Sequence, residues 1–375
     1  MDILCVSHLR WDFVFQRPQH LFSRAARQCR VFYIEEPRFE EGTPRIETTV
    51  RENGVRVCVP ILRPGGTLAP HYAQARLLEE LLATNDVSDY VLWYYTPMAQ
   101  RFTHQLTPAV VVYDCMDELS AFAGAPPEMA VLEADLFARA DVVFTGGRSL
   151  YESKRSRHPN VHLFPSSVDV AHFARARRGG DEPVDQQPIP HPRIGYFGVI
   201  DERMDYELLA AVAAARPDWH LVLLGPTAKV DPAALPTAPN LHFLGAKRYE
   251  ELPRYIAGWD VAMLPFALND ATRYISPTKT PEYLSAGKPV VSTPIADVVR
   301  PYGEAGLARI AATPQEFVAA IDAALHENAA ARIKAADAFL ANLSWDDTWT
   351  RMRRLVRLAA ERIGPSDRDG DAIHV

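Results

Sequence analysis

The residues best suited to chemistry lie between positions 276 and 294, in the segment SPTKTPEYLSAGKPVVSTP. Two cap-and-proline pairs, Ser276-Pro277 and Thr280-Pro281, are typical of a helix start, and Gly287 ends the short helix before an apolar run. A helix N-terminus presents free backbone N–H groups and the positive end of its dipole. The segment therefore predicts an anion site between a loop and a buried strand.

Side chains of the same segment would complete this site. The hydroxyls of Ser276, Thr278 and Thr280 are further donors, and Lys279 supplies a point charge. Glu282 stands one step further into the helix, where a carboxylate can accept hydrogen bonds from sugar hydroxyls. A capped helix in which Glu282 only offsets the dipole is the open alternative.

The pattern P-x-K-x-x-E-Y-L-x-A-G-K-P-V-V resembles the donor-nucleotide loop of the GT-B glycosyltransferases, group 1 or family 4-like. These are two-domain enzymes that move a sugar from a nucleotide diphosphate. The resemblance implies that Glu282 binds the donor ribose and that the diphosphate lies at Ser276, Thr278, Lys279 and Thr280.

The chain departs from this family at Tyr274, eight positions before Glu282. Relatives carry a glutamate there, which contacts the transferred sugar. Asp270 and Arg273 are the polar candidates in the same loop. The sequence therefore does not identify the sugar.

Two more segments of the second half fit the resemblance. RIGYFGVI places Gly198 at the end of a strand, where a ligand of an open α/β sheet can approach the backbone. Relatives have an arginine next, but Val199 stands there, which leaves Arg203 for the diphosphate or for a surface salt bridge. In residues 240–266 the resemblance implies a nucleobase loop, with a solvated loop as the alternative, at Lys247, Arg248 and Tyr249.

Acidic residues follow a buried strand in the first half, where VVVYDCMDELSAF contains Asp114, Asp117 and Glu118. This segment resembles the catalytic-base region of GT-B glucuronosyltransferases of polysaccharide synthesis. The resemblance implies Asp117 as the base, and Asp114 is a second catalytic candidate. A carboxylate partly removed from water can take a proton from a sugar hydroxyl. A helix start capped by Asp117 fits the same residues.

The loop after the first strand, SHLRWDFVFQRPQHL, carries aromatic and basic side chains. Such side chains suit a sugar or an anionic group through stacking and forked hydrogen bonds. We predict acceptor binding by His8, Trp11 and Arg17.

Strand-like apolar runs alternate with helical patterns in both halves, which predicts parallel α/β sheets. A length of 375 residues favours two domains. The resemblance implies a GT-B fold, with two Rossmann-like domains facing across a cleft and a C-terminal helix returning to the first. The predicted parts are an acceptor domain (1–173), a polar linker (174–192), a donor domain (193–343), the crossover helix (344–364) and a disordered tail (365–375).

Composition narrows the class of partner. A formal charge of -7 and a pI near 6.0 disfavour nucleic acid as a ligand. The four cysteines show no C-x-x-C pair, and no metal site is predicted, because the D-x-D spacing of Asp367, Asp369 and Asp371 falls in the tail. The absence of a signal-like start or a long apolar run predicts a cytoplasmic protein. Contact of the basic terminal helix with the inner membrane face is an alternative to its packing as a core helix.

The functional hypothesis is a metal-independent glycosyltransferase. It would use a nucleotide diphosphate sugar, with UDP favoured, and a sugar or lipid-linked sugar acceptor, in cell-envelope or exopolysaccharide synthesis. No cofactor is predicted, and retention or inversion is left open. The alternatives are a nucleotide-sugar 2-epimerase and a non-catalytic nucleotide-sugar-binding protein. No strand is followed by G-x-G-x-x-G, which disfavours a dinucleotide oxidoreductase.

Overall fold

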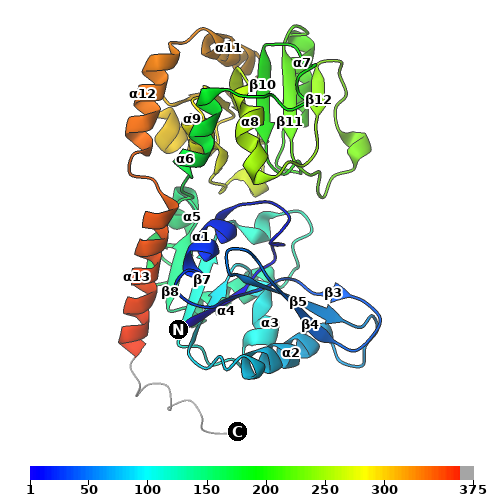
Figure 1. The fold of residues 1–375 in the computed structure, drawn as a ribbon, viewed down its shortest axis with the longest axis vertical. Coiled ribbons are helices and arrows are strands. Elements are labelled where there is room, and N and C mark those ends of the chain that lie inside the picture. The colour runs from blue at the N-terminus through cyan, green and yellow to red at the C-terminus, as the bar shows by residue number, and fades with distance from the viewer. Residues whose placement is uncertain (364–375) are drawn as a thin grey trace.

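The computed structural model describes residues 1–363 and contains two α/β domains, one above the other in Figure 1. The first domain holds a nine-stranded sheet and the second a six-stranded sheet within this range. All strand pairs are parallel except that of β4 with β5. This architecture confirms the predicted pair of Rossmann-like domains. The predicted tail from residue 365 lies outside the described residues.

The first sheet has the order β3-β5-β2-β1-β6-β7-β8-β9, with β4 on β5. Its central strands are continuous apolar runs because helices cover both faces. The strands are β1 (Asp2–Val6), β2 (Val31–Ile34), β3 (Arg38–Phe39), β4 (Arg45–Val50), β5 (Arg56–Leu62), β6 (Tyr90–Tyr94), β7 (Val110–Cys115), β8 (Val142–Thr145) and β9 (Val161–Leu163). The helices are α1 (Arg17–Ala25), α2 (Pro70–Thr84), α3 (Gln100–Thr103), α4 (Met129–Arg139) and α5 (Arg148–Lys154).

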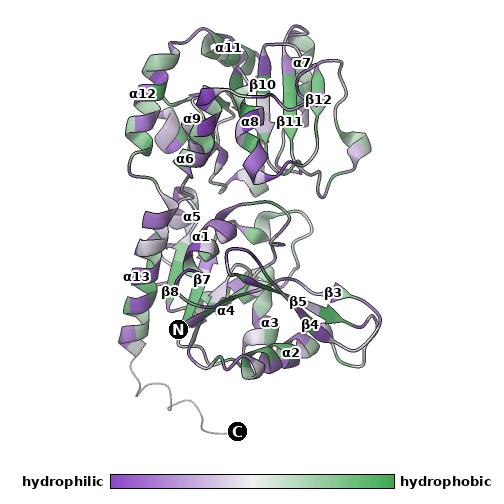
Figure 2. Cartoon of the chain, viewed as in Figure 1, coloured by the Kyte–Doolittle hydropathy of each residue, from purple (hydrophilic) through white to green (hydrophobic). Residues whose placement is uncertain are grey.

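The second sheet has the order β12-β11-β10-β13-β14-β15. Its apolar strands lie between helices whose outward faces are polar, as Figure 2 shows. The strands are β10 (Arg193–Phe197), β11 (His220–Leu224), β12 (Leu241–Phe243), β13 (Val261–Leu264), β14 (Val290–Ser292) and β15 (Ala308–Ile310). The helices are α6 (Val170–Phe173), which packs here although it precedes the first strand of this domain, α7 (Tyr206–Ala215), α8 (Leu252–Ala257), α9 (Lys279–Ser285), α10 (Ala296–Val298), α11 (Pro314–Leu325) and α12 (Ala329–Leu340).

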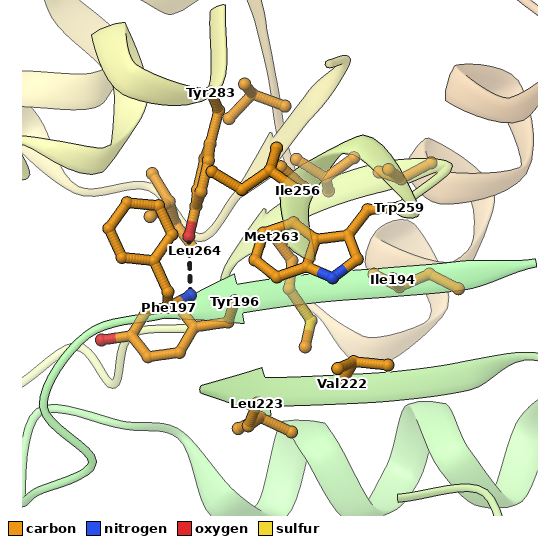
Figure 3. Close-up of a cluster of buried hydrophobic side chains, with 14 of the residues drawn as sticks. Ile194, Tyr196, Phe197, Val222, Leu223, Ile256, Trp259, Met263, Leu264 and Tyr283 are labelled. Atoms are coloured by element: carbon orange, nitrogen blue, oxygen red, sulfur yellow. Dashed lines mark hydrogen bonds between the residues drawn. The ribbon is translucent and has the colours of Figure 1, made fainter. Parts of the chain in front are cut away.

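A buried aromatic cluster fixes α9 against β10 in the second domain (Figure 3). The Trp259 ring lies over Gly195, where a Cβ atom would be only 1.9 Å from the ring. Next to it, the Tyr283 hydroxyl accepts a hydrogen bond of 3.0 Å from the backbone N–H of Phe197. The start of α9 is therefore held close to the carboxyl end of β10.

The segment 174–192 lies against the second domain. Arg177 donates to the carbonyl of Ser285 at 2.6 Å and pairs with Asp337 on α12. Gln186 is fully buried and accepts a 3.0 Å hydrogen bond from the indole of Trp259. These contacts attach the segment to the aromatic cluster.

The terminal helix α13 (Trp345–Ile363) returns to the first domain, as predicted. Trp345, Trp349 and Met352 are buried in the core cluster that also contains residues of α1. The apolar side of this helix is therefore used for packing. Among residues 1–363, no helix is long and apolar enough to cross a membrane.

A buried ion pair joins α1, β7 and α13. Arg17 is fully buried and contacts both carboxylate oxygens of Asp114, with distances of 2.9–3.1 Å. The same guanidinium donates to the carbonyl of Phe164 at 2.7 Å and lies near Met352. Removing water from these charges is costly, so the pair needs both partners.

Replacing Arg17 by Met should therefore destabilise the protein strongly. The variant leaves the Asp114 carboxylate buried without its cation, which typically costs about 3–5 kcal/mol. Urea unfolding monitored by tryptophan fluorescence measures this loss. The double variant Arg17→Met/Asp114→Leu should recover much of it, and a single variant as stable as the parent would contradict the structural role.

Candidate active site

A cleft open to solvent lies between the two domains, and residues that follow the carboxyl ends of strands in both domains line it. This is the edge at which open α/β sheets bind ligands. Predicted site residues from both domains line it: Arg17, Asp117, Gly198, Arg203, Lys247, Tyr249, Ser276, Thr278 and Lys279. The other predicted site residues are not among those that line the cleft: His8, Trp11, Asp114, Arg248, Thr280 and Glu282.

Two glycines bring backbone segments close together on the donor side. Gly198 and Gly225 end neighbouring strands and have φ values of 151° and 143°. A Cβ atom on Gly225 would lie 1.8 Å from the carbonyl oxygen of Gly198, and one on Gly198 would lie 3.2 Å from Lys279 Cε. Both positions therefore require glycine. The sequence indicated Gly198, whereas Gly225 was missed although it also follows a strand.

The predicted anion loop carries a half-buried ammonium group. Lys279 is the first residue of α9, and its ammonium donates to the Thr278 hydroxyl at 3.2 Å. The same ammonium lies 5.7 Å from the centroid of the Phe197 ring. Burial lowers the pKa of Lys279, while the nearby Glu282 raises it and Arg203 lowers it further. The helix begins three residues after Ser276, and its start has no side-chain cap.

Glu282 lies behind Lys279 and is only 7% exposed. Burial raises the pKa of Glu282 to about 7, although the positive charge of Lys279 opposes the shift. Its Oε2 atom has no hydrogen-bond partner among the described residues. A buried carboxylate oxygen without a donor is costly, so this atom is suited to accept hydrogen bonds from a ligand.

Asp117 faces this cluster from the first domain. It is half-buried, and its carboxylate has no hydrogen-bond or ion-pair partner in the described part of the chain. It caps no helix, because the short 3₁₀ turn that follows starts at Leu119 and has Glu118 in the cap position. Burial raises the pKa of Asp117; Arg203 opposes the shift and Asp201 adds to it.

Arg203 has a partner within its own domain. Its guanidinium binds Asp201 through Nε and Nη2 at 2.9 and 2.7 Å. The side chain is 25% exposed and lines the cleft. The salt bridge considered from the sequence is thus present, and it orients the guanidinium beside the cleft.

The three residues of the predicted nucleobase loop lie in different surroundings. Tyr249 is stacked between Phe15 and His172, with centroid distances of 4.3 and 4.1 Å. Both faces of its ring are therefore covered. Lys247 pairs with Asp185 at 2.7 Å. Arg248 is 78% exposed and pairs with Glu251, which matches the solvated-loop alternative.

Of the three predicted acceptor-binding residues, only Arg17 is among the residues that line the cleft. Trp11 is buried and packs edge-on against Tyr33, and the Arg17 side chain is held by Asp114. These contacts favour structural roles for Trp11, Arg17 and Asp114 over the predicted acceptor-binding and catalytic ones. Burial lowers the pKa of His8 to about 4, with a smaller effect in the same direction from the charge of Lys229, so its ring is neutral at pH 7.

Two phenylalanines of the predicted acceptor loop lie on the acceptor side of the cleft, and of these the sequence prediction missed Phe13. Phe13 and Phe15 line the cleft and are 47% and 40% exposed. Arg10 holds this loop through Glu35 at 2.9 Å, and Glu35 also accepts from the backbone N–H of Trp11 at 2.8 Å. The signal was present, since two phenylalanines stand in a loop rich in polar residues.

Comparisons with known proteins agree with this geometry. The family model described as Glycosyl transferases group 1 matches residues 191–327. The chain is 25% identical over 234 residues to a Bacillus subtilis (strain 168) protein named provisionally as the teichuronic acid biosynthesis glycosyltransferase TuaH. That match covers 58% of this chain and 59% of the relative, so the chain spans less than two thirds of the relative's length.

Solved structures match over almost the whole chain. Sucrose-phosphate synthase from Thermosynechococcus elongatus has a TM-score of 0.71 at 15% identity, covering 96% of this chain and 99% of that one. HepE of Anabaena, solved with UDP-glucose, has a TM-score of 0.68 at 14% identity and coverages of 96% and 100%.

The two facing domains and these neighbours confirm the GT-B glycosyltransferase fold. The match of residues 191–327 to the Glycosyl transferases group 1 model agrees with the donor-loop resemblance.

The buried carboxylate of Glu282 should make stability depend on pH. An acid whose pKa is raised by folding stabilises the folded state below its unfolded pKa and loses that contribution as pH rises through the folded value. For a shift from 4.5 to about 7, the loss by pH 8 is about 3 kcal/mol. Urea unfolding at pH 5 and pH 8 should show this loss in the free energy of unfolding for the parent and not for Glu282→Gln. The exposed Glu79→Gln is the control, and equal pH slopes in all three proteins would contradict the assignment.

Proposed function

We propose that this protein transfers a sugar from a nucleotide diphosphate sugar, with UDP favoured, to an acceptor hydroxyl. The observation that carries the proposal is the buried Oε2 of Glu282, which has no hydrogen-bond partner among the described residues and belongs to the same helix as Lys279, a residue that lines the interdomain cleft. A GT-B neighbour solved with UDP-glucose supports the donor class. The name of TuaH supports a role in polysaccharide assembly at the cell envelope.

In the proposed donor complex, the diphosphate lies against Ser276, Thr278 and Lys279, and the ribose hydroxyls donate to Glu282. Gly198 lets the backbone approach the phosphates. Positive charge at a fixed position stabilises the charge that develops on a leaving diphosphate. We assign this role to Lys279 and Arg203 and propose that no metal ion is required. Transfer that continues in excess chelator supports this part of the proposal.

Asp117 is the proposed base. Its carboxylate would take the proton of the acceptor hydroxyl while that oxygen bonds to the anomeric carbon. The bond from the same carbon to the diphosphate breaks, and the nucleotide diphosphate leaves with the bonding electrons. Direct displacement in this way inverts the anomeric carbon.

The acceptor is proposed to be a sugar or a lipid-linked sugar. Exposed Phe13 and Phe15 offer apolar surface on the acceptor side of the cleft. A lipid-linked acceptor would bring the protein to the inner membrane surface, where the exposed arginines of α13, Arg353, Arg354 and Arg357, would meet anionic headgroups. Formation of an epimer from the UDP sugar alone, with no transfer to any acceptor, would replace the proposal.

Lys279→Ala should weaken UDP binding about tenfold or more and uridine binding about twofold or less. The lost charge acts on the diphosphate and not on the nucleoside. Calorimetric titration with the two ligands makes the comparison. Lys334→Ala, on the exposed side of α12, is the matched control. Equal losses for UDP and uridine would refute a phosphate role.

Asp117→Asn should lower kcat by about 10²–10⁴, the usual contribution of a general base, while UDP affinity stays within about twofold. Because burial raises the pKa of Asp117, the acid limb of the parent's kcat should lie above the ordinary aspartate range and disappear in the variant. UDP release from the bound UDP sugar is the assay, and the exposed Asp135→Asn is the control. Parent-like kcat in Asp117→Asn would remove it as the base.

A further inference from the structure

A carboxylate of the second domain reaches across to the first domain beside the cleft. Asp297 lies on α10 and is only 5% exposed. Its two oxygens accept hydrogen bonds from the backbone N–H groups of Arg148 and Ser149 at 2.8 and 3.0 Å. These groups belong to the first turn of α5, so Asp297 serves as the helix cap from the opposite domain.

The sequence of the first domain leaves room for this cap. Gly147 occupies the position where a helix usually carries its own capping side chain, and it has none. A Cβ atom there would lie 2.2 Å from Asp297 Oδ2 and 2.6 Å from Ser276 Cβ. The glycine therefore lets both second-domain residues approach α5.

The same contact includes the start of the donor loop. Ser276 lines the cleft, and its hydroxyl interacts with the Asp297 carboxylate. Two residues earlier, Tyr274 packs against the core cluster of the first domain. Tyr274 stands where relatives carry a sugar-binding glutamate, and it does not line the cleft. Both residues at the start of this loop thus rest on the opposite domain.

We infer that Asp297 is a positioning residue that fastens the start of the donor loop to the first domain, so that the loop takes its diphosphate-binding form only when the domains are closed. The inference rests on the proposed function for its ligand. If the loop binds the diphosphate only in the closed arrangement of the domains, closure and diphosphate binding are thermodynamically linked, and each favours the other.

Two variants from opposite sides of the interface test this. Asp297→Ala removes the cap, and Gly147→Ala places a methyl group where the carboxylate lies. Each should weaken UDP binding about tenfold in calorimetry, and the double variant should be little worse than either single one, because both break the same contact. Asp322→Ala, exposed on α11, is the matched control and should bind UDP like the parent.

Two further readouts separate positioning from general damage. Amide hydrogen exchange at Arg148 and Ser149 should speed up in Asp297→Ala, and X-ray scattering should show a larger radius of gyration that UDP reduces. Faster exchange with parent-like UDP affinity and radius would reduce Asp297 to a local cap and overturn the inference. If the parent itself does not bind UDP, the proposed donor is wrong, and an unchanged radius in both variants would still overturn the link to closure.

Discussion

The hydrogen bond between the Tyr283 hydroxyl and the Phe197 backbone joins the two segments from which the donor side of the cleft is built. One segment is the carboxyl end of β10, which continues into Gly198, and the other is α9, which carries Lys279 and Glu282. The bond lies in an aromatic cluster that excludes water, where a lost partner is expensive. The relative positions of the glycine turn, the ammonium group and the carboxylate all follow from this attachment.

Burial then determines the chemistry of the charged groups. Glu282 and Lys279 are each pushed toward the neutral form by loss of water, and each opposes the shift of the other. On the first domain's side of the cleft, the Asp117 carboxylate has no partner among residues 1–363, while Arg203 of the second domain is already paired with Asp201. On the donor side, Glu282 Oε2 can therefore accept hydrogen bonds from a ligand. On the acceptor side, the Asp117 carboxylate can accept a proton. Such an arrangement is suited to a ligand that brings both hydroxyl donors and negative charge.

The sequence predicted the parts that depend on periodicity and strand ends. Continuous apolar runs predicted the central strands, and the stripe of Trp345, Trp349 and Met352 predicted a packed terminal helix, whose return to the first domain was implied by the family resemblance. It did not give β4, whose side chains are mostly exposed, or β5, which contains Pro60 within its apolar run. The sequence of β4 lacks the apolar pattern of a buried strand, and a proline inside an apolar run argues against a central strand for β5.

Site residues were predictable where the backbone determines their position and not where tertiary partners do. Gly198 and Lys279 follow from a strand end and a helix start, and both line the cleft. Asp114 and Arg17 have the residue types of a site, but the fold pairs them inside the first domain. Asp297 could not be found from the sequence, since its role depends on a helix about 150 positions earlier in the chain.

Thermal unfolding of the unaltered protein with nucleotides tests whether the cleft binds a nucleotide diphosphate, because a ligand that binds the folded state raises the melting temperature. We expect a saturable rise in the melting temperature with UDP and UDP sugars, a smaller rise with UMP and little change with uridine. A melting temperature that stays constant with every nucleoside diphosphate and nucleotide sugar, at concentrations up to several millimolar, would contradict it.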